Sequence, residues 1–241
     1  QFPMGQVEEL GLLKMDFLGL SNLTIIKNTL RIIKRVYGND IDLSAIPLDD
    51  DKTFALLGRG DTTGVFQFES SGMRGMLKSI KPDTFEDLIA LVSLYRPGPM
   101  EWIPDYINGK HAKKKPQYLH PKLEPILNVT YGVAVYQEQV MEICRSLAGY
   151  SYGRADVVRR AMSKKKQEVM EQERQTFLYG LDGVCSGAIQ NGVPKAVAES
   201  IFDEISRFAA YAFNKSHAVA YAYLAYQTAY LKCHYFSAYM A

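Results

Sequence analysis

The sequence contains only three cysteines among its 241 residues, and no two of them form a CxxC pair. An odd number of widely spaced cysteines predicts neither a zinc site nor a disulfide framework, and it is typical of a protein in a reducing cytosol. The sequence also lacks a run of about 18 uncharged apolar residues and a basic-then-apolar signal pattern at its N-terminus. We therefore expect a cytoplasmic protein that makes no contact with a membrane.

A strong excess of positive charge is absent as well, since 28 lysines and arginines face 26 aspartates and glutamates. Any binding to nucleic acid must therefore come from local basic clusters rather than from a general basic field. The motifs GxxxxGK[ST], GxSxG and HExxH, which mark P-loop, serine-hydrolase and zinc-peptidase sites, are missing too. What the sequence does have is a 47% share of hydrophobic residues, enough for one large domain or two small ones.

Hydrophobic periodicity predicts a mainly helical chain with a few short strands. A short apolar run bounded by glycines indicates a buried strand over Leu12–Leu18, and residues 62–73 have a strand-like pattern. Residues 96–125 hold most of the prolines, which predicts a loop-rich connector. The expected helices cover residues 21–38, 49–60, 74–82, 84–95, 137–148, 153–178, 194–209 and 216–235, with Ser21 and Thr84 as N-cap candidates.

The strongest basic cluster lies in RADVVRRAMSKKKQEVMEQERQ, residues 154–175, which contains Arg159 and Arg160. Arginine binds phosphate oxygens through a planar, bidentate group, and lysine adds a point charge. Two interpretations stay open at this point. The cluster could face a polyanion, or it could be a solvated basic face balanced by the glutamates one turn later.

A second candidate site is the start of the tyrosine-rich segment YAFNKSHAVAYAYLAYQTAYLKCHY, residues 211–235. Asn214 and Ser216 are N-cap residue types, and they precede a long helical pattern. Lys215 and His217 would then lie beside free backbone N–H groups at the positive end of the helix dipole, where an anion is stabilised. An ordinary capped core helix remains the alternative.

A third candidate is Asp16, an acid in the apolar run LGLLKMDFLGLSNLTII. A carboxylate among such residues is costly unless a cation or a metal ion compensates it. Two-metal chemistry needs several converging carboxylates, and neither Glu8–Glu9 nor Asp49–Asp51 offers a convincing partner. Asp16 alone therefore makes no metal site, and it could simply pair with Lys14 at a strand edge. Both chain ends look cut, and we expect the chain to be a piece of a longer protein.

Six motifs follow one another along the chain: GLLKMDFLGL, GVFQFESSGM, FEDLIALVSLYRPGPM, TYGVAVYQEQVM, GRADVVRRAMSKKK and AAYAFNKSHAVAYAYLAYQTAYLK. In sequence and order they resemble those of the alpha subunit of bacterial DNA polymerase III, the C-family of replicative DNA polymerases. The resemblance runs over essentially all residues.

The resemblance implies two domains: residues 1–38 as the end of a mixed α/β palm and residues 39–241 as the helical fingers. In this family three palm aspartates bind two Mg²⁺ ions. Asp16 matches the third of them, and Lys14 matches the palm lysine that reaches the incoming triphosphate. The other two aspartates would precede residue 1, so we expect the chain alone to lack polymerase activity.

The resemblance also implies a nucleotide-binding surface on the fingers. Arg159 and Arg160 match the arginine pair that lines the nucleotide pocket, and the segment Asn214, Lys215, Ser216 and His217 matches the motif that faces the incoming nucleotide. The implied activity is template-directed transfer of nucleotides from dNTP to a primer 3′-hydroxyl. The implied partners are primer–template DNA, dNTP, the sliding clamp and other replicase subunits.

Two other classes of protein remain as alternatives. One is a helical module that binds single-stranded nucleic acid without catalysis, with the tyrosine-rich helix as a stacking platform. The other is a purely structural helical domain that binds proteins. The first alternative predicts exposed tyrosine rings, and comparison of triphosphate with monophosphate binding would separate all three.

Overall fold

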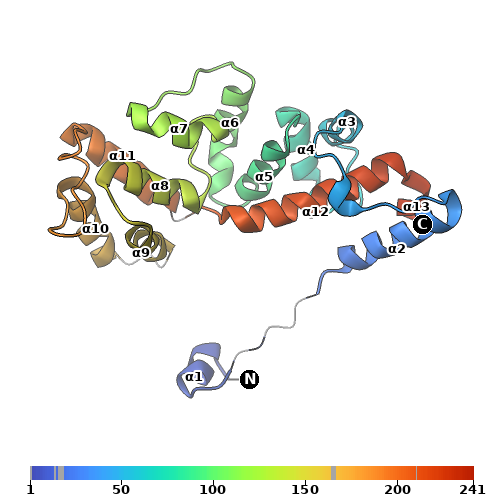
Figure 1. Ribbon diagram of the computed structural model, residues 1–241, viewed down its shortest axis with the longest axis horizontal. Helices are drawn as coiled ribbons and strands as arrows, with labels where there is room; N and C mark the ends of the chain where they lie inside the picture. The colour runs from blue at the N-terminus through green and yellow to red at the C-terminus, as the bar shows by residue number, and fades with distance from the viewer. Residues whose placement is uncertain (1, 14, 16–18, 164–166, 210) are drawn as a thin grey trace.

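The computed structural model describes residues 2–13, 15, 19–163, 167–209 and 211–241 (Figure 1). This part of the chain is mainly helical, as the sequence predicts, and it contains no β-sheet. The α-helices are α1 (Met4–Glu9), α2 (Ser21–Tyr37), α3 (Asp51–Arg59), α4 (Ser71–Ile80), α5 (Phe85–Leu94), α6 (Ile103–Lys110), α7 (Glu124–Leu127), α8 (Gln137–Ala148), α9 (Tyr152–Ser163), α10 (Gln167–Tyr179), α11 (Lys195–Ala209), α12 (Lys215–His234) and α13 (Phe236–Met240). None of the helices in these ranges is long and apolar enough to cross a membrane.

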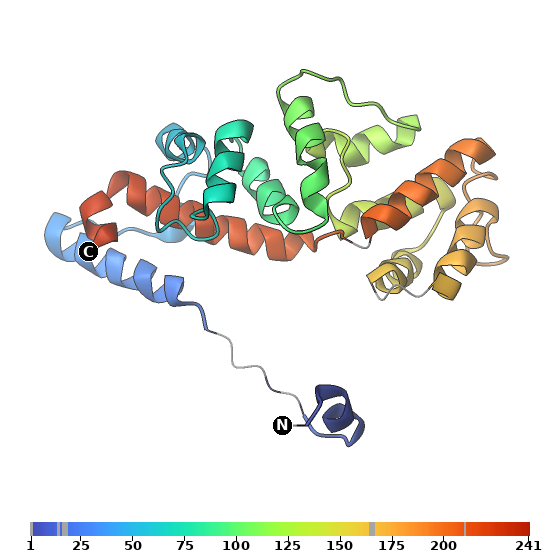
Figure 2. The ribbon, with the colours of Figure 1, turned by 180° about the vertical axis from the view of Figure 1, so that it is seen from behind.

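The long helix α12 runs through the middle of the molecule (Figures 1 and 2). Helices α3 and α5 pack along it, and α13 folds back at its C-terminal end beside α2. Helices α8 to α11 form a lobe at the end of the molecule where α12 begins. Alanines at 218, 222, 225 and 229 are buried, and these small side chains let neighbouring helices approach the backbone of α12 closely.

Three clusters of buried hydrophobic residues make up the core. The first lies between α3, α4, α5, α6 and α12, and the third lies between α2, α13 and the last turns of α12. The second joins α7 to α11 and does not include α12. Helix α12 therefore links two of the three clusters, and its first residues lie beside the other one.

The start of α5 is held by a buried carboxylate. Asp87 closes a capping box with Thr84, and it also accepts hydrogen bonds from Tyr106 Oη at 3.1 Å and Lys110 Nζ at 2.7 Å. Both charged side chains are buried, with exposed fractions of 1% for Asp87 and 5% for Lys110. Asp83 accepts a second bond from the same ammonium group at 2.5 Å, so one cation of α6 is held by two carboxylates at the start of α5.

Several expected elements differ from the structure. The described residues of the expected strand, Leu12, Leu13 and Met15, lie in no strand, because no neighbouring strand in the described chain offers them hydrogen-bond partners. The residues with the strand-like pattern, 62–73, instead form successive turns and then the first residues of α4. In those turns Phe66 donates its backbone N–H to Thr228 Oγ1 on α12 rather than to a strand.

Other corrections concern helix boundaries. Leu20, not Ser21, is the N-cap of α2, and the cap has no side-chain hydrogen bond. The single helix expected over 153–178 is two helices, α9 and α10, which pack against each other so that both bury apolar residues in the second cluster. The connector over 96–125 contains α6 and the first two residues of α7. The expected helices from 49 to 60, 84 to 95, 137 to 148 and 194 to 209 are confirmed to within two residues at each end.

We predict that Asp87→Ala lowers the free energy of unfolding by about 3–5 kcal/mol, because it removes the one buried carboxylate that pairs with the Lys110 ammonium and leaves Tyr106 Oη without its acceptor. The matched control is Asp105→Ala, whose carboxylate is 56% exposed and lies 3.7 Å from an exposed Lys114. We expect that change to cost no more than about 1 kcal/mol. Equilibrium denaturation of both variants measures the difference, and equal losses would contradict the role given to Asp87.

Candidate functional site

The N-terminus of α12 is capped by Asn214. Its Oδ1 accepts a hydrogen bond from the His217 N–H at 3.0 Å, and its carbonyl accepts the first helical bond from Ala218. Ser216 lies inside the first turn, so of the two candidate residues Asn214 is the cap. Both residues are exposed, and Lys215 and His217 belong to the same first turn of the helix.

The start of α12 is joined to the start of α8 by an isolated parallel bridge between Tyr136 and Phe213. Phe213 donates its N–H to the Val135 carbonyl at 3.1 Å, and its carbonyl accepts from the Gln137 N–H at 2.9 Å. Two helix N-termini with their positive dipole ends therefore lie next to each other. Such an arrangement favours negative charge between them.

Glu138, in the first turn of α8, supplies such a charge. Its carboxylate accepts the Lys215 N–H at 3.0 and 3.1 Å. The N–H of His217 is bonded to Asn214 Oδ1. Among the described residues, the Ser216 N–H is thus the one amide of the first three in α12 that has no hydrogen-bond acceptor. The sequence predicts a row of free amides here, whereas the structure has them largely occupied.

The side chains of Lys215 and His217 lie on the outside of this junction. Lys215 Nζ is 5.3 Å from the centre of the Tyr136 ring and lines a cavity of about 600 Å³ between α7, α8 and the start of α12. The exposed His217 ring lies between two aromatic rings, with centroid distances of 5.4 Å to Phe213 and 4.2 Å to Tyr221. Both groups can therefore meet a ligand that approaches from solvent.

The arginine pair on α9 shares one carboxylate. Asp156 accepts Arg159 Nε through Oδ1 and Arg160 Nε through Oδ2, both at 2.7 Å. Hydrogen bonds and charge from the two arginines, Arg159 first, lower the pKa of Asp156 below its ordinary value. Arg160 remains 69% exposed, whereas Arg159 is 29% exposed.

Arg159 connects the two predicted groups of residues. Its Nη1 donates to Gln137 Oε1 at 3.2 Å, and the backbone of Gln137 is bonded to Phe213, directly before Asn214. The residues at 159–160 and 214–217, which are far apart in the sequence, are therefore linked at the junction of α8 and α12. The other two predicted residues, Lys14 and Asp16, lie outside the described residues.

The sequence does not predict that two further residues, Glu138 and Arg96, belong to this junction. Glu138 is visible in the sequence only as an acid in a first helical turn, which does not reveal the second helix that it contacts. Arg96 follows α5 and places its guanidinium 4.5 Å from the centre of the Phe213 ring, where it also donates to the Tyr211 carbonyl. Arg96 therefore fixes the segment that leads into α12.

A magnesium site is not formed by the described residues. Among them, one group of three residues has metal-binding atoms close together: Asp50, Cys233 and His234. This group lies at the opposite end of α12 from Asn214, and its thiol and imidazole are not the oxygen ligands that Mg²⁺ prefers. Asp16, the predicted magnesium ligand, is not among the described residues.

Comparison with known proteins agrees with the motifs. A family model described as "Bacterial DNA polymerase III alpha subunit finger domain" matches residues 22–183. DNA polymerase III subunit alpha of Halalkalibacterium halodurans is 54% identical over 241 residues, which is 100% of this chain and 21% of that protein. The protein of the same name from Staphylococcus aureus strain COL is 53% identical over 235 residues, 98% of this chain and 21% of the relative. The chain spans about a fifth of the length of these relatives, and it belongs to the family of the bacterial DNA polymerase III alpha subunit finger domain.

Proposed function

We propose that this chain is the nucleotide-contacting part of a bacterial replicative DNA polymerase, which transfers nucleotides from dNTP to a primer 3′-hydroxyl on a DNA template. The observation that carries the proposal is the link from Arg159 through Gln137 to Phe213, because it joins both groups of predicted phosphate-binding residues at one junction. Relatives named DNA polymerase III subunit alpha support the same activity for the whole protein.

In this proposal the side chains rather than the backbone amides bind the triphosphate, since the amides of Lys215 and His217 are already bonded. Arg160 and Lys215 extend toward solvent and would neutralise charge on the β- and γ-phosphates, where charge develops as pyrophosphate leaves. The ring of His217, which contacts the tilted rings of Phe213 and Tyr221, would contact the nucleotide from the start of α12. Asp156 would hold Arg159 and Arg160 in place before the nucleotide binds.

We further propose that residues 1–38 belong to the palm and residues 39–241 to the fingers. Asp16 would be one ligand of the two Mg²⁺ ions that polarise the reacting phosphate in the complete enzyme, and Lys14 would contact the triphosphate. The assignments of Asp16 and Lys14 are made from the KMDF motif. Primer–template DNA, the sliding clamp and other replicase subunits would be partners of the complete enzyme in the cytoplasm.

The alternative of a single-stranded nucleic-acid module fits the structure less well. That function needs exposed aromatic rings for base stacking. Tyr226 is buried, and its hydroxyl group donates to the Pro47 carbonyl at 2.8 Å and accepts the Asp50 N–H at 3.0 Å. Tyr223 is half-buried, and its hydroxyl donates to the Leu43 carbonyl. These tyrosines anchor the segment before α3 to α12 rather than offering a stacking platform.

We expect Arg160→Ala in the full-length polymerase to raise the KM for dNTP roughly tenfold and to lower kcat, because a guanidinium on the phosphates acts in binding and in the transition state. The matched control is Arg59→Ala on α3. That arginine is similarly exposed, at 62%, and pairs with a nearby aspartate, Asp61, at 3.0 Å. Steady-state primer extension with both variants tests the assignment. Similar, small effects from the two changes would favour a solvated basic face.

The start of α12 allows binding and stability to be separated. Lys215→Ala is expected to weaken dNTP binding by about 1.5–3 kcal/mol, the range for charge-assisted hydrogen bonds, with little change in thermal stability. Asn214→Ala is expected to cost about 1 kcal/mol of stability, because it removes the cap of α12.

Titration of both full-length variants with dNTP and dNMP, together with thermal melting, measures these effects. A loss that is specific for the triphosphate supports the pocket. If Lys215→Ala destabilises the fold and leaves dNTP binding unchanged, Lys215 is a structural residue and the assignment fails. Binding of single-stranded DNA without preference for the triphosphate would favour the alternative module.

A further inference from the structure

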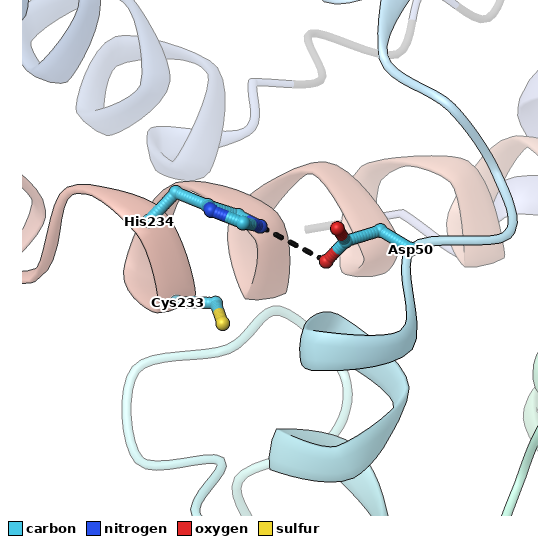
Figure 3. A group of neighbouring side chains, drawn as sticks. All are labelled: Asp50, Cys233 and His234. Atoms are coloured by element: carbon cyan, nitrogen blue, oxygen red, sulfur yellow. Dashed lines mark hydrogen bonds and ion pairs between the residues drawn. The ribbon is translucent and has the colours of Figure 1, made fainter.

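The C-terminal end of α12 brings side chains of three metal-binding types to the start of α3. Cys233 and His234 lie in the last turn of α12, and Asp50 lies directly before α3 (Figure 3). One thiol sulfur, one imidazole nitrogen and one carboxylate oxygen from these residues all lie within 4.8 Å of one another. This group is distant from the candidate nucleotide-binding residues, and the proposed polymerase function does not use it.

The bonds of Asp50 leave room for a further ligand. Its Oδ2 accepts the Thr53 N–H at 2.8 Å, the Thr53 hydroxyl at 2.7 Å and His234 Nε2 at 2.9 Å. Among the described residues, no hydrogen bond goes to Oδ1 of this carboxylate. One oxygen therefore holds the helix cap while the other remains available to an ion.

Neighbouring groups hold the donors in place. The ring of Tyr230 packs on the ring of His234, with 4.3 Å between centroids, and the hydroxyl group of Tyr226 accepts the Asp50 N–H at 3.0 Å. The side chains of Asp50 and His234 are 19% and 23% exposed. An ion can thus enter from solvent, and a water molecule can fill the position that protein atoms leave open.

The donor set matches zinc chemistry. Zn²⁺ takes four ligands in a tetrahedron, at about 2.3 Å to sulfur and about 2.0–2.2 Å to nitrogen and oxygen, so its ligand atoms lie roughly 3.3–3.7 Å apart. Donors within 4.8 Å of one another reach these separations by side-chain movements of about 1 Å. A thiolate and a carboxylate together also neutralise the double charge of the ion.

We propose that Asp50, Cys233 and His234 bind one Zn²⁺ ion, with water as the fourth ligand, and that this ion fastens the end of α12 to the start of α3. On binding, Zn²⁺ takes the place of the thiol proton of Cys233, and His234 coordinates through the nitrogen that now contacts Asp50. The protons that are displaced pass to solvent.

Two simpler roles account for less of the geometry. A capping aspartate paired with a histidine explains the contact between Asp50 and His234, and Cys233 packs against the first hydrophobic cluster, but neither role accounts for three donor atoms within 4.8 Å of one another. A reactive cysteine needs a pKa below the ordinary value. Burial, followed by the charge of Asp50, raises the pKa of Cys233 instead. The spacing of the cysteines along the chain predicts no zinc site, because the proximity of Asp50 to the end of α12 is a tertiary contact that this spacing does not reveal.

The test is titration of the metal-free 241-residue chain with Co²⁺ in excess Mg²⁺, followed by competition with Zn²⁺. We expect one Co²⁺ per chain with a thiolate-to-cobalt charge-transfer absorption, which Zn²⁺ abolishes. Cys233→Ala should remove this absorption and weaken Zn²⁺ binding about a hundredfold or more. The matched control is Cys185→Ala, which removes a similarly half-buried thiol outside the group and should leave the absorption unchanged.

A second variant keeps the fold intact while it removes a ligand charge. Asparagine is as good an N-cap as aspartate, so Asp50→Asn preserves the start of α3 and should still weaken Zn²⁺ binding at least tenfold. In thermal melts, Zn²⁺ should raise the Tm of the unchanged chain and not that of Cys233→Ala. The proposal is overturned if no thiolate absorption forms, if Cys233→Ala retains it, or if Zn²⁺ leaves the Tm of the unchanged chain where it was.

Discussion

The structure depends on the burial of the second half of α12, where every residue from Ala225 to Lys232 except Tyr230 is buried. A helix in this position must satisfy its own polar groups inside the protein. It does so through the loop before α4: Lys232 Nζ donates to the carbonyls of Asp61 and Thr63, and Thr228 Oγ1 accepts the N–H of Phe66. The alanines of α12 remove bulk where α3 and α5 approach. Polar contacts therefore fix the register of the loop, and small side chains set the distance between the helices.

The candidate site follows from the same constraint. Because α12 is held along its length, its first turn has a defined position, and the bridge between Tyr136 and Phe213 places α8 beside it. Arg96 stabilises the approach to this turn, Glu138 occupies one of its amides, and Arg159 joins it from α9 through Gln137. The exposed cations then stand on a rigid base. A site on helix ends is more precisely positioned than one on loops.

The sequence predicts the helices well where local signals, such as N-cap residues and terminal glycines, determine where a helix begins and ends. Thr84 and Asn214 are N-caps of the expected type, and Gly38, Gly60 and Gly149 end helices in the left-handed conformation. The sequence-based prediction is wrong where a contact with a residue distant in the sequence determines the backbone conformation. The alternating apolar pattern around Phe66 reads as a strand, but Gln67 has a φ of 64° and the backbone bonds to α12. The motif residues of the site are identified from the resemblance. The roles of Glu138 and Arg96 depend on which helix ends lie next to each other in the tertiary structure, and the sequence does not reveal this.

The continuity of α12 has a mechanical consequence. A helix of 20 residues is about 30 Å long, and this one has no proline or glycine at which it could bend. It therefore behaves as a lever arm between its two ends. A tilt of about 5° around its first turn displaces its last turn by roughly 2.6 Å, more than the freedom of a packed side chain. A ligand that tilts the start of α12 must therefore displace the residues that pack on its last turn, in α2, in α13 and at the Asp50–His234 contact. A stronger Asp50–His234 contact would oppose that tilt.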